Sequence, residues 1–157
     1  MIFEGITTTK LEWNLQEIFD NTHLFYDEIN NVKQLLEDIK KYENAELDST
    51  LLLDLLDKKW KIKEIINNIL IYGSLMYYKN VNDDEFIKLK SVAESFNNDV
   101  NTKLKFIDRK ILSLGLEKVS SFINENPKLE LYKLSLHNLF RLEEHILNCS
   151  FMPSLFS

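Results

Sequence analysis

Residues 82–114 read NDDEFIKLKSVAESFNNDVNTKLKFIDRKILSL, and this stretch decides the fold. Apolar side chains recur in it every three or four positions, which places them on one stripe of a helix. They are Phe86, Leu89, Ala93, Phe96, Val100, Leu104, Ile107, Ile111 and Leu114. Asn82 is a suitable N-cap, and Gly115 follows the last apolar residue as a stop signal. The pattern therefore predicts one helix over residues 82–114.

Two further long helices are predicted before this stretch. Over residues 22–43 a single apolar stripe recurs at spacings of three and four, formed by Phe25, Ile29, Val32, Leu36 and Ile39. Ser49 is a good N-cap for a second helix over residues 49–79. The second half of that helix is apolar nearly all round, which is typical of a helix at the centre of a domain.

The whole composition agrees with long helices. The chain has 157 residues, the size of one domain, and contains only three Gly and two Pro. Such sparse turn punctuation favours helices over sheets. Shorter helices are predicted over residues 117–124 and 129–147. We expect an all-α fold, a bundle of long antiparallel helices, with one domain over residues 1–147 and an uncharged tail over residues 148–157.

The charge balance bears on partners and location. The formal net charge is −6, which repels phosphate backbones, so we expect no nucleic-acid partner. The basic residues are scattered and form no polybasic membrane patch. The longest apolar stretch, residues 65–78, is interrupted by polar residues and is too short to span a bilayer. The first ten residues lack the pattern of a signal peptide, so we expect no membrane association and a cytoplasmic location.

The residue types that could carry chemistry are poorly placed for it. Cys149 is the only cysteine, so it can form neither an internal disulfide nor a thiolate zinc site. His137 and His145 are eight residues apart, about 12 Å along a helix, which is too far to share one metal. Acidic neighbours such as Asp83 and Asp84 are interpreted as a helix cap or a solvated face. We predict no catalytic residue, no metal ligand and no cofactor in this chain.

One aromatic cluster is a candidate binding surface. Residues 72–78 read YGSLMYY, and Tyr72, Met76, Tyr77 and Tyr78 could face a peptide or a protein partner. Aromatic side chains on a helix also pack into cores. The sequence leaves both interpretations open.

Several segments, taken in order, resemble a known family. Residues 13–19, WNLQEIF, are similar to the W-x-L-x-x-[LI]-[YF] opening of oligoendopeptidase F-type zinc metallopeptidases, which are relatives of the thimet oligopeptidases. Residues 71–77, IYGSLMY, resemble the Y-x-x-L-x-Y segment of that family. Residues 106–114, FIDRKILSL, resemble its F-x-x-x-E-[IL]-L-x-L segment, with Lys110 where the family favours Glu. Residues 131–147 resemble the L-x-x-Y-x-x-x-L-x-x-[LI]-x-R-x-x-x-H-x-L stretch of the family.

The resemblance covers about residues 11–147 and implies the N-terminal helical region of such a peptidase, truncated before the catalytic domain. In the family this region walls part of the channel through which short peptides reach the zinc. The HExxH motif that holds the zinc is absent from this chain, so no catalytic residue is carried over and the chain alone is not expected to be an enzyme.

The resemblance also implies partners. The missing catalytic half or short peptides would contact this helical region, and apolar surface left uncovered would favour self-association. The alternative is a free-standing helical module that binds a protein or peptide.

Overall fold

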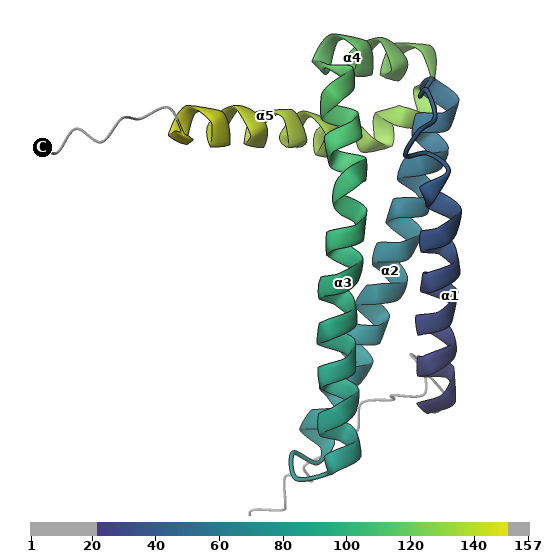
Figure 1. Ribbon diagram of the computed structural model, residues 1–157, viewed down its shortest axis with the longest axis vertical. Coiled ribbons are helices and arrows are strands. Elements are labelled where there is room, and N and C mark those ends of the chain that lie inside the picture. Colours follow the sequence, from purple (N-terminus) through teal and green to yellow (C-terminus); the bar gives the residue numbers. More distant parts are fainter. Residues whose placement is uncertain (1–21, 151–157) are drawn as a thin grey trace, which may run out of the picture.

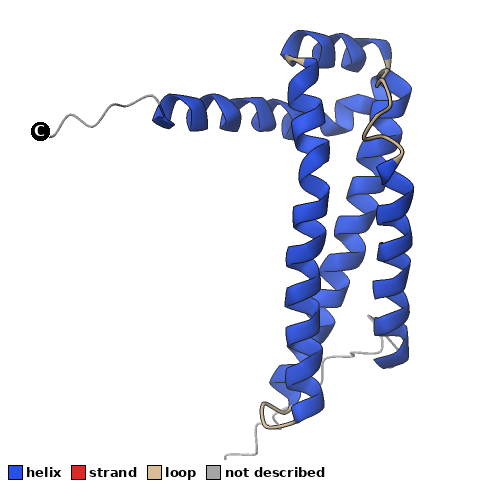
Figure 2. Cartoon of the chain, in the orientation of Figure 1, coloured by secondary structure: helices blue, strands red, loops and turns tan. Residues whose placement is uncertain are grey.

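The computed structural model describes the backbone of residues 22–150 and the side chains of residues 22–143. Its helices are α1 (Thr22–Lys40), α2 (Ser49–Lys79), α3 (Asp84–Leu114), α4 (Leu116–Glu125), the 3-10 helix η2 (Pro127–Tyr132) and α5 (Lys133–Ser150). The described residues contain no strand (Figure 2). The expected all-α fold is therefore confirmed.

The three long helices lie side by side along the long axis of the molecule (Figure 1). Each is joined to the next by a short connection, so neighbouring helices run antiparallel. Helix α4 lies across one end of the bundle, and α5 runs across the long axis and away from the other helices (Figure 1). None of the helices in the described part is long and apolar enough to cross a membrane.

The core lies between α1, α2 and α3, and α2 packs against both of its neighbours. The stripes predicted for α1 and α3 are buried, from Phe25 to Ile39 and from Leu89 to Ile111. The two helices α2 and α3 approach each other closely at Gly73. A Cβ atom there would lie 3.1 Å from the Cβ of Ala93 and 3.3 Å from the carbonyl oxygen of Leu89. The glycine in the YGSLMYY segment is thus a packing residue.

The helix ends differ in detail from the prediction. The N-caps are Asp48 and Asp83, one residue from the expected Ser49 and one residue from the expected Asn82. The carboxylate of Asp83 accepts hydrogen bonds from the backbone N–H groups of the next helical turn, which explains why an acidic residue takes the cap position. Gly115 ends α3 with φ 83°, as a stop residue should.

The C-terminal part departs further from the prediction. Residues 127–132 form the 3-10 helix η2, which opens with Pro127, and the α-helical bonding of α5 begins only at Lys133. Helix α5 continues to Ser150, three residues beyond the predicted end. The remainder of the predicted tail lies outside the described residues, as do residues 1–21 with the WNLQEIF segment.

Polar contacts join the long helices at their surfaces. Lys59 of α2 forms an ion pair with Asp108 of α3. The ammonium group of Lys110 donates a hydrogen bond of 3.0 Å to the carbonyl oxygen of Glu43, in the connection between α1 and α2. The lysine that departs from the family pattern therefore ties this connection to α3.

Candidate functional site

The inner half of the aromatic cluster belongs to the core. Tyr72 is only 3% exposed, and its ring centroid lies 5.6 Å from that of Phe25 on α1. Met76, one turn further along α2, is half-buried and packs against the core. These two side chains hold α2 against its neighbours, so Tyr72 is not available to a partner in this conformation.

The outer half of the cluster faces solvent at the end of α2. The rings of Tyr77 and Tyr78 meet edge to face with centroids 5.5 Å apart, and Tyr78 is 71% exposed. The ammonium group of Lys90, on α3, lies 4.3 Å from the ring centroid of Tyr77. A cation over an aromatic face stabilises both side chains in place. The two tyrosines and the lysine form an amphipathic surface of rings, hydroxyls and positive charge.

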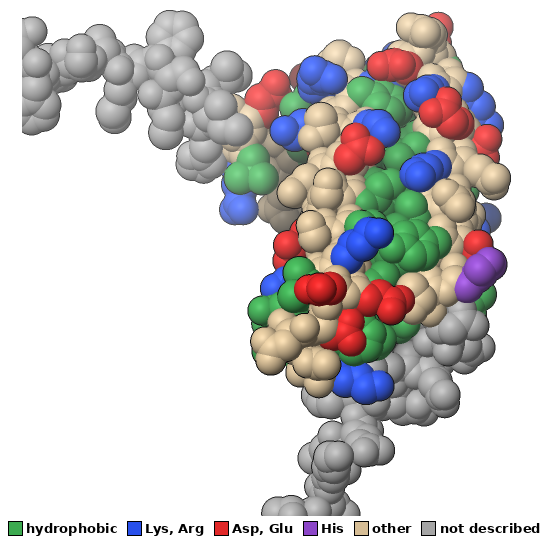
Figure 3. All heavy atoms as spheres, turned by 60° about the horizontal axis from the view of Figure 1, so that its bottom comes forward, with side chains coloured by type: hydrophobic (Ala, Val, Ile, Leu, Met, Phe, Trp, Pro, Cys, Tyr) green, Lys and Arg blue, Asp and Glu red, His purple; other side chains and the backbone are tan. Residues whose placement is uncertain are grey.

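The end of the molecule at which α1 begins carries charges of both signs. Figure 3 shows hydrophobic side chains as a band along the middle of this face, with Lys, Arg, Asp and Glu side chains on and beside it. The exposed hydrophobic side chains near this end of the three long helices are Leu24, Tyr26, Ile71, Tyr78 and Ile87. This face offers both apolar and charged contacts.

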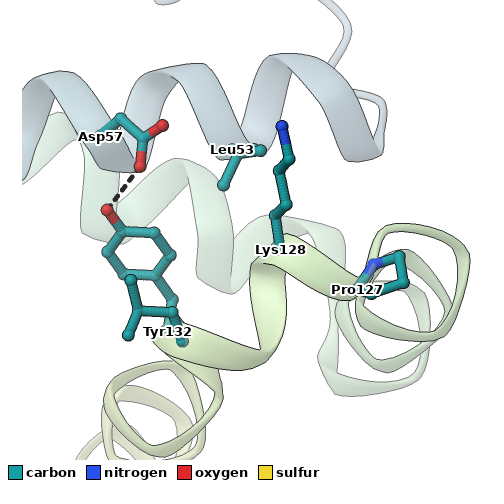
Figure 4. Close-up of a pocket in the computed structure, with 6 residues that line it drawn as sticks. Leu53, Asp57, Pro127, Lys128 and Tyr132 are labelled. Atoms are coloured by element: carbon teal, nitrogen blue, oxygen red, sulfur yellow. Dashed lines mark hydrogen bonds between the residues drawn. The ribbon is translucent and has the colours of Figure 1, made fainter.

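A second surface feature lies where α2 meets η2. An open pocket of about 420 Å³ is lined by Leu53, Asp57, Pro127, Lys128, Leu131 and Tyr132. In Figure 4 the Lys128 side chain extends toward α2 beside Leu53. The hydroxyl group of Tyr132 donates a hydrogen bond of 2.6 Å to the Asp57 carboxylate (Figure 4). The pocket is mostly apolar, with an ammonium and a carboxylate at its edges.

The electrostatics of this pocket follow from its partial burial. Desolvation, and then the hydrogen bond to Asp57 and the negative charge of that carboxylate, raise the pKa of Tyr132 to about 12. The phenol therefore stays protonated and remains a hydrogen-bond donor well above neutral pH.

Within the described residues, no three His, Cys, Asp or Glu side chains come together in a way that could hold a metal ion. His137 is exposed on α5. The side chains of His145 and Cys149 lie outside the described residues. Asp83 is the N-cap of α3, which is one of the two interpretations, helix cap or solvated face, that the sequence allowed for this acidic group.

Sequence reasoning missed the pocket at α2 and η2. Asp57 and Tyr132 are 75 residues apart, and nothing in either segment indicates that they meet. The one local signal is Pro127, which lies between the helices predicted over residues 117–124 and 129–147. Its consequence, a 3-10 turn that brings Leu131 and Tyr132 back to α2, depends on tertiary packing.

The fold and these two surfaces define an all-helical protein with one aromatic and one pocket-like surface feature. Comparison with curated proteins finds similarity to peptidases. The chain is 26% identical over 137 residues to the oligoendopeptidase F homolog of Borreliella burgdorferi, an alignment that covers 87% of this chain and 23% of the relative. It is 23% identical over 137 residues to oligopeptidase PepF of Bacillus subtilis, which covers 87% of this chain and 20% of the relative.

A third relative extends the pattern. The chain is 20% identical over 140 residues to the group B oligopeptidase PepB of Streptococcus agalactiae, covering 88% of this chain and 23% of the relative. The chain is therefore a relative of the oligoendopeptidase F-type peptidases. It spans between a fifth and a quarter of the length of the curated relatives that it matches. No family model and no solved structure matches the chain.

Proposed function

We propose that this chain is the non-catalytic N-terminal helical part of an oligoendopeptidase F-like zinc metallopeptidase, a part that walls the channel for short peptides. The observation that carries the proposal is the coverage of the alignments, which include nearly the whole chain but at most 23% of a relative. A segment that serves one structural layer of a longer peptidase would match in this way. A cytoplasmic location is part of the proposal.

The donor chemistry of the described residues supports a non-catalytic role. A zinc site of a peptidase needs three protein ligands that converge on one point. No such set is found in residues 22–143, so these residues do not fit the metal and we derive no step through it.

Tyr77, Tyr78 and Lys90 are the groups we assign to peptide contact. The rings offer apolar area with little loss of side-chain entropy, and the ammonium offers a partner for a C-terminal carboxylate. Calorimetric titration of the chain with short peptides tests this assignment. We expect weak binding that the Tyr78→Ala variant loses and that a Leu116→Ala variant, changed at an exposed position beyond the far end of α3, retains. Equal heats of peptide binding for the two variants would contradict the assignment.

The alternative is a free-standing helical module that binds a protein or peptide, and the half-buried Tyr77 with the exposed Tyr78 favours it equally. The DNA downstream of the coding sequence separates the two. An in-register reading frame that encodes HExxH supports the peptidase layer, and its absence supports the free-standing module.

A further inference from the structure

Two lysines of α2 lie one turn apart where this helix packs against α3. Lys59 and Lys63 are separated by four residues, a spacing that places both side chains on one face of the helix. Lys59 forms an ion pair with Asp108 of α3, and its side chain is only 24% exposed. Lys63 is exposed, and its side-chain nitrogen donates a hydrogen bond to the side-chain oxygen of Asn101 on α3. A carboxylate therefore holds one lysine, and a neutral amide holds the other.

The amide that holds Lys63 is itself fixed in orientation. The side-chain nitrogen of Asn101 donates a hydrogen bond of 3.0 Å to the side-chain oxygen of Asn97, one turn earlier on α3. The oxygen of Asn101 is thereby left to accept from Lys63. An amide oxygen can accept from an ammonium group or from a neutral amine, whereas a carboxylate strongly favours the ammonium group. Asn101 thus positions the nitrogen of Lys63 without fixing its charge.

The charges around Lys63 favour its neutral form. Partial burial, and then the positive charge of Lys59, lower the pKa of Lys63, and the carboxylate of Asp108 opposes this shift. That carboxylate is already engaged in the ion pair with Lys59. Within the part of the chain that the structure describes, no carboxylate forms an ion pair with Lys63. A larger fraction of Lys63 is therefore neutral near neutral pH than of a lysine with the ordinary pKa of 10.5.

A neutral lysine amine is a nucleophile, because its nitrogen carries a free electron pair. Proteins activate a lysine by partial desolvation or by a second cation beside it. Lys63 has both features, and its exposure leaves it open to a reagent in solution. Lys59 differs from it in the one respect that matters, since a direct carboxylate partner stabilises its charged form.

We propose that Lys63 is a site of covalent acylation by thioesters. Its nitrogen attacks the thioester carbonyl carbon, a C–N bond forms while the C–S bond breaks, the thiolate leaves, and the nitrogen gives its extra proton to solvent. The amide product keeps one N–H group, which can still donate to Asn101, and the ion pair of Lys59 with Asp108 is not involved. Acylation therefore removes one positive charge and retains the polar contacts between α2 and α3. The proposal does not depend on the function proposed above.

Acetylation of the purified chain by acetyl-coenzyme A near neutral pH tests the proposal. The extent of reaction at each lysine is followed over time by mass spectrometry of peptides cut at acidic residues. Lys88, an exposed lysine on α3, is the internal reference. We expect Lys63 to be acetylated faster than Lys88 and faster than the ion-paired Lys59. A rate at Lys63 that does not exceed the rate at Lys88 would overturn the proposal.

Two variants separate the effect of charge from that of accessibility. Lys59→Gln removes the neighbouring cation and should slow the acetylation of Lys63 by about twofold, the factor expected for a like-charge pair at this spacing. Asp108→Asn removes the opposing carboxylate and should accelerate the reaction by a similar factor. Both substitutions break the same ion pair, so a loosening of α2 from α3 would change both rates in the same direction. Changes in the same direction, or no change in either variant, would contradict the proposal.

The matched control is Lys61→Gln, which removes an exposed cation only two residues from Lys63. Side chains two residues apart on a helix do not face each other, so the rate at Lys63 should stay unchanged. Circular dichroism of each variant shows whether it is folded, and we expect the spectra to agree. A loss of rate in Lys61→Gln as large as that in Lys59→Gln would show that net charge, and not the neighbouring lysine, sets the reactivity, and would overturn the proposal.

Discussion

Tyr132 shows how one side chain links distant parts of the chain. Its hydroxyl reaches Asp57 on α2 while its ring lines the pocket, and this contact holds η2 against the bundle. Because burial and the carboxylate raise the folded-state pKa to about 12, against an ordinary value of 10.0, folding favours the protonated phenol. The resulting stabilisation is complete below pH 10 and is lost as the pH rises from 10 through about 12.

The corresponding experiment compares the alkaline titrations of the unaltered chain and the Tyr132→Phe variant by phenolate absorbance. We expect the difference between them to show one tyrosine that ionises near pH 12. A difference centred at the ordinary pKa of 10.0 would show that the hydroxyl is not held by Asp57. At neutral pH the variant should lose about 1 kcal/mol of unfolding free energy, at the low end for a hydrogen bond to a charged group, because Asp57 is exposed.

At the scale of the helices, the apolar stripes predicted the long elements because each covers many turns. Phe25 to Ile39 and Leu89 to Ile111 are buried as expected, and no local signal competes with them. The capping residues could not be chosen by pattern alone. Asp83 follows Asn82 directly, and either residue type is a suitable N-cap. Which of the two caps the helix depends on whether the Asn82 amide or the Asp83 carboxylate reaches the backbone N–H groups of the first turn.

The cap of α3 gives a direct prediction. Replacement of Asp83 by Ala should destabilise the chain by about 1 kcal/mol, since two backbone N–H groups lose their acceptor. Asn82→Ala should change the urea midpoint by much less, and it is the matched control. Equal losses of stability in Asp83→Ala and Asn82→Ala would show that both side chains cap the helix.

The contact residues were harder to predict than the helices, because their exposure depends on how the helices pack against one another. The segment of residues 72–78 showed four plausible contact residues, and all four lie on one helix. Which of them face inward depends on where α1 and α3 pack, and the structure divides them into a buried Tyr72 and an exposed Tyr78. The tyrosine-facing Lys90 comes from α3, so only the packed structure could reveal it.

At the scale of the whole molecule, the helices form a layer with exposed surfaces at both ends. The Tyr77–Tyr78 pair lies at the end of α2, and the pocket lined by Asp57 and Tyr132 lies near the start of the same helix. The two features are therefore formed by different residues and can be tested separately by substitution.

The central claim is that this chain is a non-catalytic part of a peptidase, and a zinc and peptidase assay of the purified chain tests it most directly. The protein would be dialysed, its zinc content measured, and its hydrolysis of a quenched fluorescent peptide followed beside the Bacillus subtilis oligopeptidase as a positive control. We expect no stoichiometric zinc and no hydrolysis that a chelator abolishes. One zinc retained per chain together with chelator-sensitive cleavage would contradict the account.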